Sequence, residues 1–481
     1  MDFEGLANQY LGSNDTIYGS TPIQDVEDLK KALQTSYATD VASYTGGDAL
    51  RLQSLEKALH IITFRAQHLV LWREIEKDIA YSTVEEYTLL KGYGSDGGIS
   101  FVGQTETPIE SVGDYERKVA FVKFMGVVRS VSLASVLVRK LVPDIIGRET
   151  TNGIMKILAD WTWAMYWGDS KKVRNSTQEG LEFDGIISVV EREVPQNVYD
   201  LRGGIDLDRA LSYLAEVIYN QYGTINRLFA PSGVIQKFTQ SYYGQQRVFI
   251  PTATGGIGAG FFISQFDTIA GTVLFRPDAL FRPQYTYSTT ATSNQAPNPQ
   301  ITVNAAFANN TTADWSKGNV AGNSVQYAVV AGNTRGLSAP VQTASVSITA
   351  NETRAIRITI TEVNQGTIPA QFYVIFRNDI ESNGRRSGFG VVAVIPASSL
   401  QQNNTITFED TNRILPNSKT AVVGNFTREC LVFSRLLPLV RVPLPVVGQA
   451  IPWMILLYGV PKYYNPRWLG VIRNIDYVRT I

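Results

Sequence analysis

Apolar residues recur at helical spacing in three stretches of the chain. Between Asp48 and Lys77 they follow alternating steps of three and four residues, which predicts an amphipathic helix. The stretch 150–168 has the strongest pattern, with capping residue types at its start and Gly168 at its end. A third stretch covers 206–222. We interpret all three as packing helices, and at 1.5 Å per residue the second is about 28 Å long.

Between the first two helices the pattern is that of extended chain. Ser82–Leu90 and Ile99–Val102 favour strands, and the segment Gly92–Gly98 between them contains four glycines. This arrangement predicts a long β-hairpin with a flexible tip. Tyr115–Leu133 is rich in apolar residues, which predicts one strand that is covered on both faces.

The pattern changes again in the second half of the chain. Residues 294–417 alternate with period two, turn residues separate the runs, and 16 of the 26 Asn residues lie here. These features are typical of an all-β sandwich of the immunoglobulin or fibronectin type. The polar, proline-containing ends of the segment indicate an inserted domain. In the tail, 425–481, six prolines are predicted to break the chain into short extended pieces.

The composition leaves little material for catalysis or metal binding. Lys and Arg total 43 and Asp and Glu total 43, so the net charge of zero favours only weak contact with nucleic acid. Cys430 is the single cysteine, and the two histidines, His60 and His68, are interpreted as structural residues of the first helix. The glycine-rich stretch Gly255–Gly260 precedes strand-like residues, so we interpret it as a loop between strands and not as a phosphate-binding turn. We therefore expect no enzyme activity, no cofactor and no metal.

Two further features concern the setting of the protein. The N-terminal residues show no secretory signal pattern, and the apolar run Ala450–Val460 is too short to span a bilayer, so we expect no membrane contact. A polar arm, a glycine-tipped hairpin and a proline-broken tail bury little surface within one monomer. Such extensions are stabilised when they lie over neighbouring subunits, which favours a structural, oligomeric role.

A series of short motifs resembles one family. The long predicted helix runs into Tyr166–Asp169, and it is followed by other matching segments in the same order. These segments are Tyr81–Val84, Ser132–Ser135, Gly180–Ile186, Leu436–Pro438, Leu457–Gly459 and Arg473–Ile475. The series resembles the major capsid proteins of tailed bacteriophages, which have the HK-ninety-seven fold, and in particular those of large contractile-tailed phages of the Twort type.

The resemblance implies an α+β fold with the parts of that family. The expected parts are an N-terminal arm with helices at 1–80, an extended hairpin (the E-loop) at 81–115, a peripheral domain at 116–183 with its spine helix at 150–168, an axial domain at 184–290, the inserted β-sandwich at 291–420, and a return to the axial and peripheral domains at 421–481.

The resemblance also implies the function and the partners. The chain is expected to assemble with itself into hexamers and pentamers of an icosahedral phage head around double-stranded DNA, which it contacts weakly and without sequence specificity. Portal, scaffold and decoration proteins are the other expected partners, and the location is the virion capsid, assembled in the host cytoplasm. The residues expected at contacts between subunits are Gly92, Gly94, Asp96, Gly97, Gly98, Gly255, Gly256 and Gly258. Two alternatives stay open here: an encapsulin-like compartment shell, and a phage tail or adhesin protein with a sandwich that binds ligands.

Overall fold

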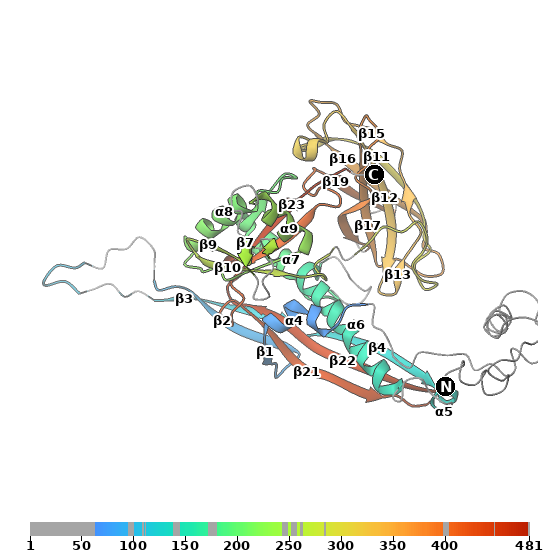
Figure 1. Ribbon diagram of the computed structural model, residues 1–481, viewed down its shortest axis with the longest axis horizontal. Coiled ribbons are helices and arrows are strands. Elements are labelled where there is room, and N and C mark those ends of the chain that lie inside the picture. The colour runs from blue at the N-terminus through green and yellow to red at the C-terminus, as the bar shows by residue number, and fades with distance from the viewer. Residues whose placement is uncertain are drawn as a thin grey trace, which may run out of the picture. The chain divides into compact units, whose positions relative to one another are not determined.

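The fold was analysed in a computed structural model of the chain. The structure describes residues 63–94, 101–107, 110, 112–137, 145–171, 180–242, 249–251, 257–259, 263–282, 285–397, 404–446 and 448–479. All of them belong to one compact unit that covers Ile61–Ile481. The unit combines helices with several sheets, which confirms the α+β prediction (Figure 1).

The predicted helix over 48–77 is wrong in the part that the structure describes. A 3-10 turn, η2 (Ala66–His68), leads to a short helix, α4 (Val70–Glu74), and then to a strand, β1 (Glu76–Ile79). His68 lies in η2, where its ring Nδ1 accepts a hydrogen bond from a backbone amide three residues earlier. The remainder of the predicted helix, including His60, lies outside the described residues.

A four-stranded sheet with the order β1-β21-β22-β4 contains the two longest strands of the C-terminal tail. The tail is not broken into short pieces, because β21 (Leu431–Pro443) and β22 (Ala450–Tyr463) are 13 and 14 residues long. Proline lacks an N–H group and therefore disrupts a strand only where a ladder bond is lost. Pro438 lies at a bulge, while Pro452 and Pro461 lie where the pairing with one neighbouring strand has ended. The prolines thus fall where the sheet needs no donor.

The helix α6 (Ile145–Trp167) lies along this sheet (Figure 1). It begins earlier than the predicted 150–168, because Thr150 does not cap the helix. Its hydroxyl donates to the carbonyl of Ile146 one turn back, at 2.8 Å. The helix packs very closely on the sheet at Gly153, where an added Cβ atom would lie 2.4 Å from a methyl carbon of Ile455.

The strand β4 (Lys123–Ser132) shows that the prediction of a single strand in this region is wrong. Tyr115–Leu133 forms not one strand but two, β3 (Asp114–Phe121) and β4, which are separated by the buried Val122. In both strands exposed and less exposed residues alternate, so neither strand is covered on both faces within this chain. β4 is followed by the short helix α5 (Leu133–Leu137).

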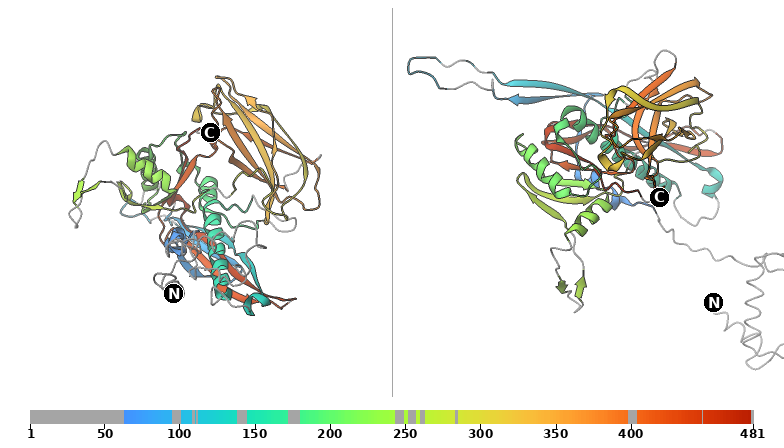
Figure 2. Two further views of the ribbon diagram at one scale, coloured as in Figure 1. Left: turned by 45° about the vertical axis from the view of Figure 1, so that its right-hand side comes forward. Right: turned by 90° about the horizontal axis from the view of Figure 1, so that it is seen from above.

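The second strand of the predicted hairpin was also wrong. The partner of β2 (Val84–Gly92) is β3, and the part of Ile99–Val102 that the structure describes forms no strand. The two strands form a separate sheet, called the ribbon below, which projects from the other sheets (Figures 1 and 2).

A six-stranded sheet with the order β5-β23-β20-β6-β10-β9 forms a second core together with two helices, while the helix that precedes them packs into the core of the four-stranded sheet. The third predicted helix is present but ends at Tyr219. The helices are α7 (Ile186–Glu193), α8 (Leu207–Tyr219) and α9 (Ser232–Ser241), and the 3-10 turns are η3 (Pro195–Asn197) and η6 (Pro466–Trp468). The strands are β5 (Val198–Asp200), β6 (Arg227–Ala230), β9 (Gln265–Thr268), β10 (Gly271–Pro277), β20 (Lys419–Gly424) and β23 (Leu469–Ile475).

The strands predicted by the period-two pattern are present and form two sheets, called the sandwich below. Both sheets contribute to one core; Val325 and Ile375 from one sheet and Ile358 from the other are fully buried in it. The strands are β11 (Gln300–Thr312), β16 (Arg354–Asn364) and β19 (Thr405–Asp410) in one sheet, and β12 (Ser324–Asn333), β17 (Phe372–Ile380) and β18 (Gly390–Pro396) with β13 (Gly336–Leu337), β14 (Val341–Gln342) and β15 (Val346–Ser347) in the other; η4 (Lys317–Asn319) connects them. The immunoglobulin-like assignment stays a prediction.

Candidate assembly surface

One face of the ribbon carries exposed apolar side chains. The register pairs Val84 with Phe121 and Leu90 with Tyr115, and paired residues of an antiparallel ladder lie on the same face. Val119 lies between these pairs, and all five side chains are exposed. The side chain of Tyr115 is 67% exposed and that of Phe121 is 59% exposed. The ion pair of Glu86 with Arg117 lies on the same face, between the apolar pairs at its two ends. Large exposed apolar groups gathered on one face of a ribbon are typical of an interaction surface.

The opposite face of the ribbon is attached to the rest of the chain near its base. The hydroxyl of Tyr87 donates to the carbonyl of Tyr463 at 3.2 Å, and burial raises the pKa of Tyr87 to about 12. On the same face, Lys118 forms an ion pair of 2.6 Å with Glu193 of α7. The ribbon is therefore held from one side, while its apolar face stays open to solvent.

The apolar surface continues towards the tip of the ribbon. Tyr93 is 93% exposed and Phe101 is 92% exposed. Of the tip residues predicted to contact other subunits, Gly92 ends β2 and Gly94 has a positive φ of 155°, whereas Asp96, Gly97 and Gly98 lie outside the described residues. The sequence-based prediction singled out the glycines and missed the aromatic side chains of Tyr93, which lies between two of them, and of Phe101, which follows them.

A second exposed apolar face lies on the four-stranded sheet. Because α6 covers one face of this sheet, side chains of β4 that point the other way stay uncovered. Phe124 and Val128 are both more than 60% exposed, at 62% and 63%. Phe124 contacts the ring of Tyr458 edge-on, at 4.7 Å between ring centroids, and Val128 pairs with Met454. The face is thus an apolar surface built from two strands that are distant in sequence.

The glycine-rich stretch predicted as a second contact site is described only in part. Gly258 belongs to β8 (Ile257–Ala259), which pairs with β7 (Phe249–Pro251) in a sheet of two strands. Gly255 and Gly256 lie outside the described residues. This sheet is separate from the ribbon, so Gly258 and the ribbon glycines belong to different elements.

In the described parts of the chain, no cluster of three His, Cys, Asp or Glu side chains has the arrangement of a metal site. Cys430 is buried, and burial raises the pKa of its thiol, which disfavours the reactive thiolate. Among the described helices, none combines the length and the apolar character needed to cross a bilayer.

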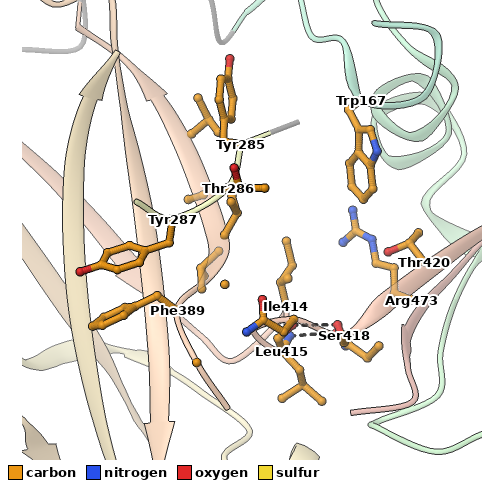
Figure 3. Close-up of a pocket in the computed structure, with 18 of the residues that line it drawn as sticks. Trp167, Tyr285, Thr286, Tyr287, Phe389, Ile414, Leu415, Ser418, Thr420 and Arg473 are labelled. Carbon is orange, nitrogen blue, oxygen red and sulfur yellow. Dashed lines mark hydrogen bonds between the residues drawn. The ribbon is translucent and has the colours of Figure 1, made fainter. Parts of the chain in front are cut away.

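A cavity of about 510 Å³ lies between the sandwich and the rest of the chain. Tyr285, Tyr287 and Phe389 line one side, while Trp167 and Arg473 line the other (Figure 3). Burial lowers the pKa of Arg473 to about 10, and its guanidinium forms an ion pair with Glu191. The cation in this cavity already has a partner within the chain.

Comparisons with known proteins address the resemblance directly. No family model matches the sequence. The major capsid protein of Staphylococcus phage K is 24% identical over 454 residues, which are 94% of this chain and 96% of that one. A chain from Enterococcus phage phiEF24C is 26% identical over 457 residues, with the same shares of the two chains.

The solved structures that were found are more distant. The SrpI encapsulin complex from Synechococcus elongatus matches 92% of this chain and 98% of its own, with 10% identity and a TM-score of 0.40. The capsid of a native GTA particle matches 91% and 99%, with 9% identity and a TM-score of 0.42. The sequence comparisons are more specific, because they cover nearly all of both chains at higher identity. They confirm the resemblance that the motifs indicated: over almost its whole length, this chain is similar to the major capsid proteins of bacteriophages.

Proposed function

We propose that the chain is a structural, non-enzymatic major capsid protein that assembles with itself into the shell of a phage head. The observation that carries this proposal is the similarity to proteins named major capsid protein over 94% of the chain. The order of elements supports an HK-ninety-seven-like fold, with a projecting ribbon, a long helix on a sheet and a second sheet covered by helices. We assign the ribbon as the E-loop and α6 as the spine helix.

The exposed ribbon supports self-assembly on physical grounds. A two-stranded ribbon is marginally stable in water, and this one exposes five large apolar side chains on one face. Full burial of one such side chain contributes about 1.5–3 kcal/mol. We propose that a second copy of the chain covers this face, and that the open face of the four-stranded sheet around Phe124 and Val128 is the complementary surface.

The remaining contacts of the proposed shell rest on the resemblance. Gly92, Gly94, Asp96, Gly97 and Gly98 belong to the contact between subunits, and the stretch around Gly258 belongs to the centre of hexameric and pentameric capsomers. Portal, scaffold and decoration proteins, weak contact with packaged double-stranded DNA, and assembly in the host cytoplasm are part of the proposal. The net charge of zero supports weak rather than tight contact with DNA. The domain boundaries stay predictions.

The proposal is tested by expressing the full chain and imaging the purified material by electron microscopy. We expect closed shells from the wild type. We expect Tyr115→Glu with Phe121→Glu to remain folded but unassembled, because both charges would have to be buried between subunits. The matched control is Val363→Glu, since Val363 is 64% exposed and lies on the sandwich, away from the ribbon.

Two results would contradict the proposal. Wild-type chains that form neither closed shells nor separate hexameric or pentameric capsomers would favour a tail or adhesin protein. Shells at normal yield from the double ribbon variant would show that the apolar face is not an assembly surface. Far-ultraviolet circular dichroism of each variant separates loss of assembly from loss of folding.

A further inference from the structure

The end of β23 turns towards the sandwich at two residues with left-handed backbone. Asn474 has a φ of 53° and Asp476 a φ of 55°, a conformation that Asn and Asp tolerate better than most residues. Both side chains are held in place. The amide of Asn474 donates to Asp200 at 2.8 Å, and the carboxylate of Asp476 accepts from Lys237 and Lys419, each at 2.5 Å. The direction of the following residues is therefore well defined.

Those following residues, Tyr477–Arg479, are called the strap here. The hydroxyl of Tyr477 donates to Asp379 of β17 at 2.5 Å. The guanidinium of Arg479 donates to Glu381 at 2.9 Å and to the carbonyl of Gly318 at 2.8 Å. Hydrogen bonding from Arg479 lowers the pKa of the Glu381 carboxyl, which indicates that the contact favours the charged form. The strap thus joins the last strand of the six-stranded sheet to the sandwich.

The strap contacts the sandwich at a fully buried charge network. Arg377 donates to Asp379 at 2.8 Å, to Asp410 at 2.7 Å and to Asn412 at 2.8 Å. One buried cation therefore faces two buried carboxylates, and further donors are needed to satisfy the second carboxylate. The hydroxyl of Tyr477 is such a donor, and it comes from outside the sandwich strands.

Two cavities lie between the sandwich and the rest of the chain, away from the strap. The cavity of about 510 Å³ in Figure 3 separates Tyr287 and Phe389 from Trp167 and Arg473. A second cavity of about 350 Å³ lies between the sandwich residue Phe372 and α6. By contrast, two more ion pairs lie beside the strap, Arg202 with Asp314 at 3.0 Å and Lys317 with Asp200 at 2.8 Å. A third cavity, of about 490 Å³, lies on the strap side and is lined by the strap and by Glu381. Cavities therefore lie on both sides, and what distinguishes the strap side is the set of hydrogen bonds and ion pairs that cross it.

We propose that the strap is a latch that fixes the orientation of the sandwich relative to the six-stranded sheet. The chain enters the sandwich through the segment 285–299 before β11 and leaves it through the segment 411–418 after β19. These two segments are called the connections here. When the latch is released, the sandwich turns about these connections into the open cavities while its own strands stay folded. This inference goes beyond the proposed shell function and does not depend on it.

The test uses hydrogen exchange followed by mass spectrometry on the full chain, in wild type and in the double variant Tyr477→Phe with Arg479→Ala. Phenylalanine keeps the ring packing and removes only the hydroxyl. We expect amides of both connections to exchange roughly tenfold to a hundredfold faster, the range set by losing a hydrogen bond to a charged group. Amides of β12 and β17 should change by a much smaller factor, because Asp379 keeps the guanidinium of Arg377 as a donor. The matched control is Val478→Ala, a half-exposed side chain on the same strap.

A second variant keeps the proposal testable if the double variant does not fold. Glu381→Gln weakens the same contact from the sandwich side and leaves the strap unchanged. It should accelerate exchange in the connections by a smaller factor. Unchanged exchange in the connections of the folded variants overturns the proposal. An equal increase in β12 and β17 also overturns it, because the strap would then be part of the sandwich fold rather than a latch.

Discussion

Replacing Arg377 by Met tests how strongly the sandwich depends on its buried charge network. The side chain of Arg377 is fully buried on β17, and methionine has a similar length without the charge. In the variant, each of the two carboxylates keeps one side-chain donor. Asp379 keeps the hydroxyl of Tyr477, and Asp410 keeps the hydroxyl of Tyr327 at 2.8 Å. Neither carboxylate keeps a cation within the network.

The expected loss follows from the charges that remain. Removal of one partner from a buried ion pair typically costs about 3–5 kcal/mol, because the other charge stays buried without compensation. We expect this loss in the free energy of opening of the sandwich. The control is Arg357→Met on β16, where the ion pair with Glu409 is partly exposed and contributes at most about 1 kcal/mol.

The measurement is hydrogen exchange of β12 and β17 at increasing urea and neutral pH. A loss for Arg377→Met no larger than that for Arg357→Met at neutral pH would refute the reasoning.

Two further predictions concern Gly168, which follows the helix α6, and Lys77 in the strand β1. Gly168→Ala should strongly destabilise the chain, by about 2 kcal/mol or more, because the new Cβ atom would lie 2.5 Å from two backbone oxygens; a lowered urea midpoint measures this, and an unchanged midpoint would contradict it. Burial, and then the nearby Arg435, lower the pKa of Lys77 to about 8. The folded state therefore binds fewer protons than the unfolded state, and this group should make stability rise between about pH 7 and 10. Lys77→Met should reduce that rise in the urea midpoint, and an identical pH profile would count against the lowered pKa.

Local periodicity was sufficient to predict the elements whose burial pattern is regular. The apolar spacing that ends at Gly168 identified α6, and the alternation around Val325 and Ile358 identified strands of the sandwich. In these segments each residue type reports directly whether its position is buried, so no knowledge of the partner is needed. The motif series by itself also indicated the capsid family.

Pairing between distant segments could not be predicted in this way. The partner of β2 is β3 and not 99–102, and the tail prolines are tolerated in β21 and β22 only because of where neighbouring strands end. Such positions depend on register, which is set by residues far away in the sequence.

The exposed face of the ribbon and the strap are likewise products of the tertiary structure. Phe121 and Val84 are ordinary strand residues in the sequence, and only their pairing places them together on an open face. Tyr477 reaches Asp379 across 98 residues of sequence, because β23 ends beside the sandwich. The burial pattern in the sequence indicates whether a side chain is covered. Only the three-dimensional fold determines which residues cover it, and therefore which surfaces stay free to contact a second copy of the chain.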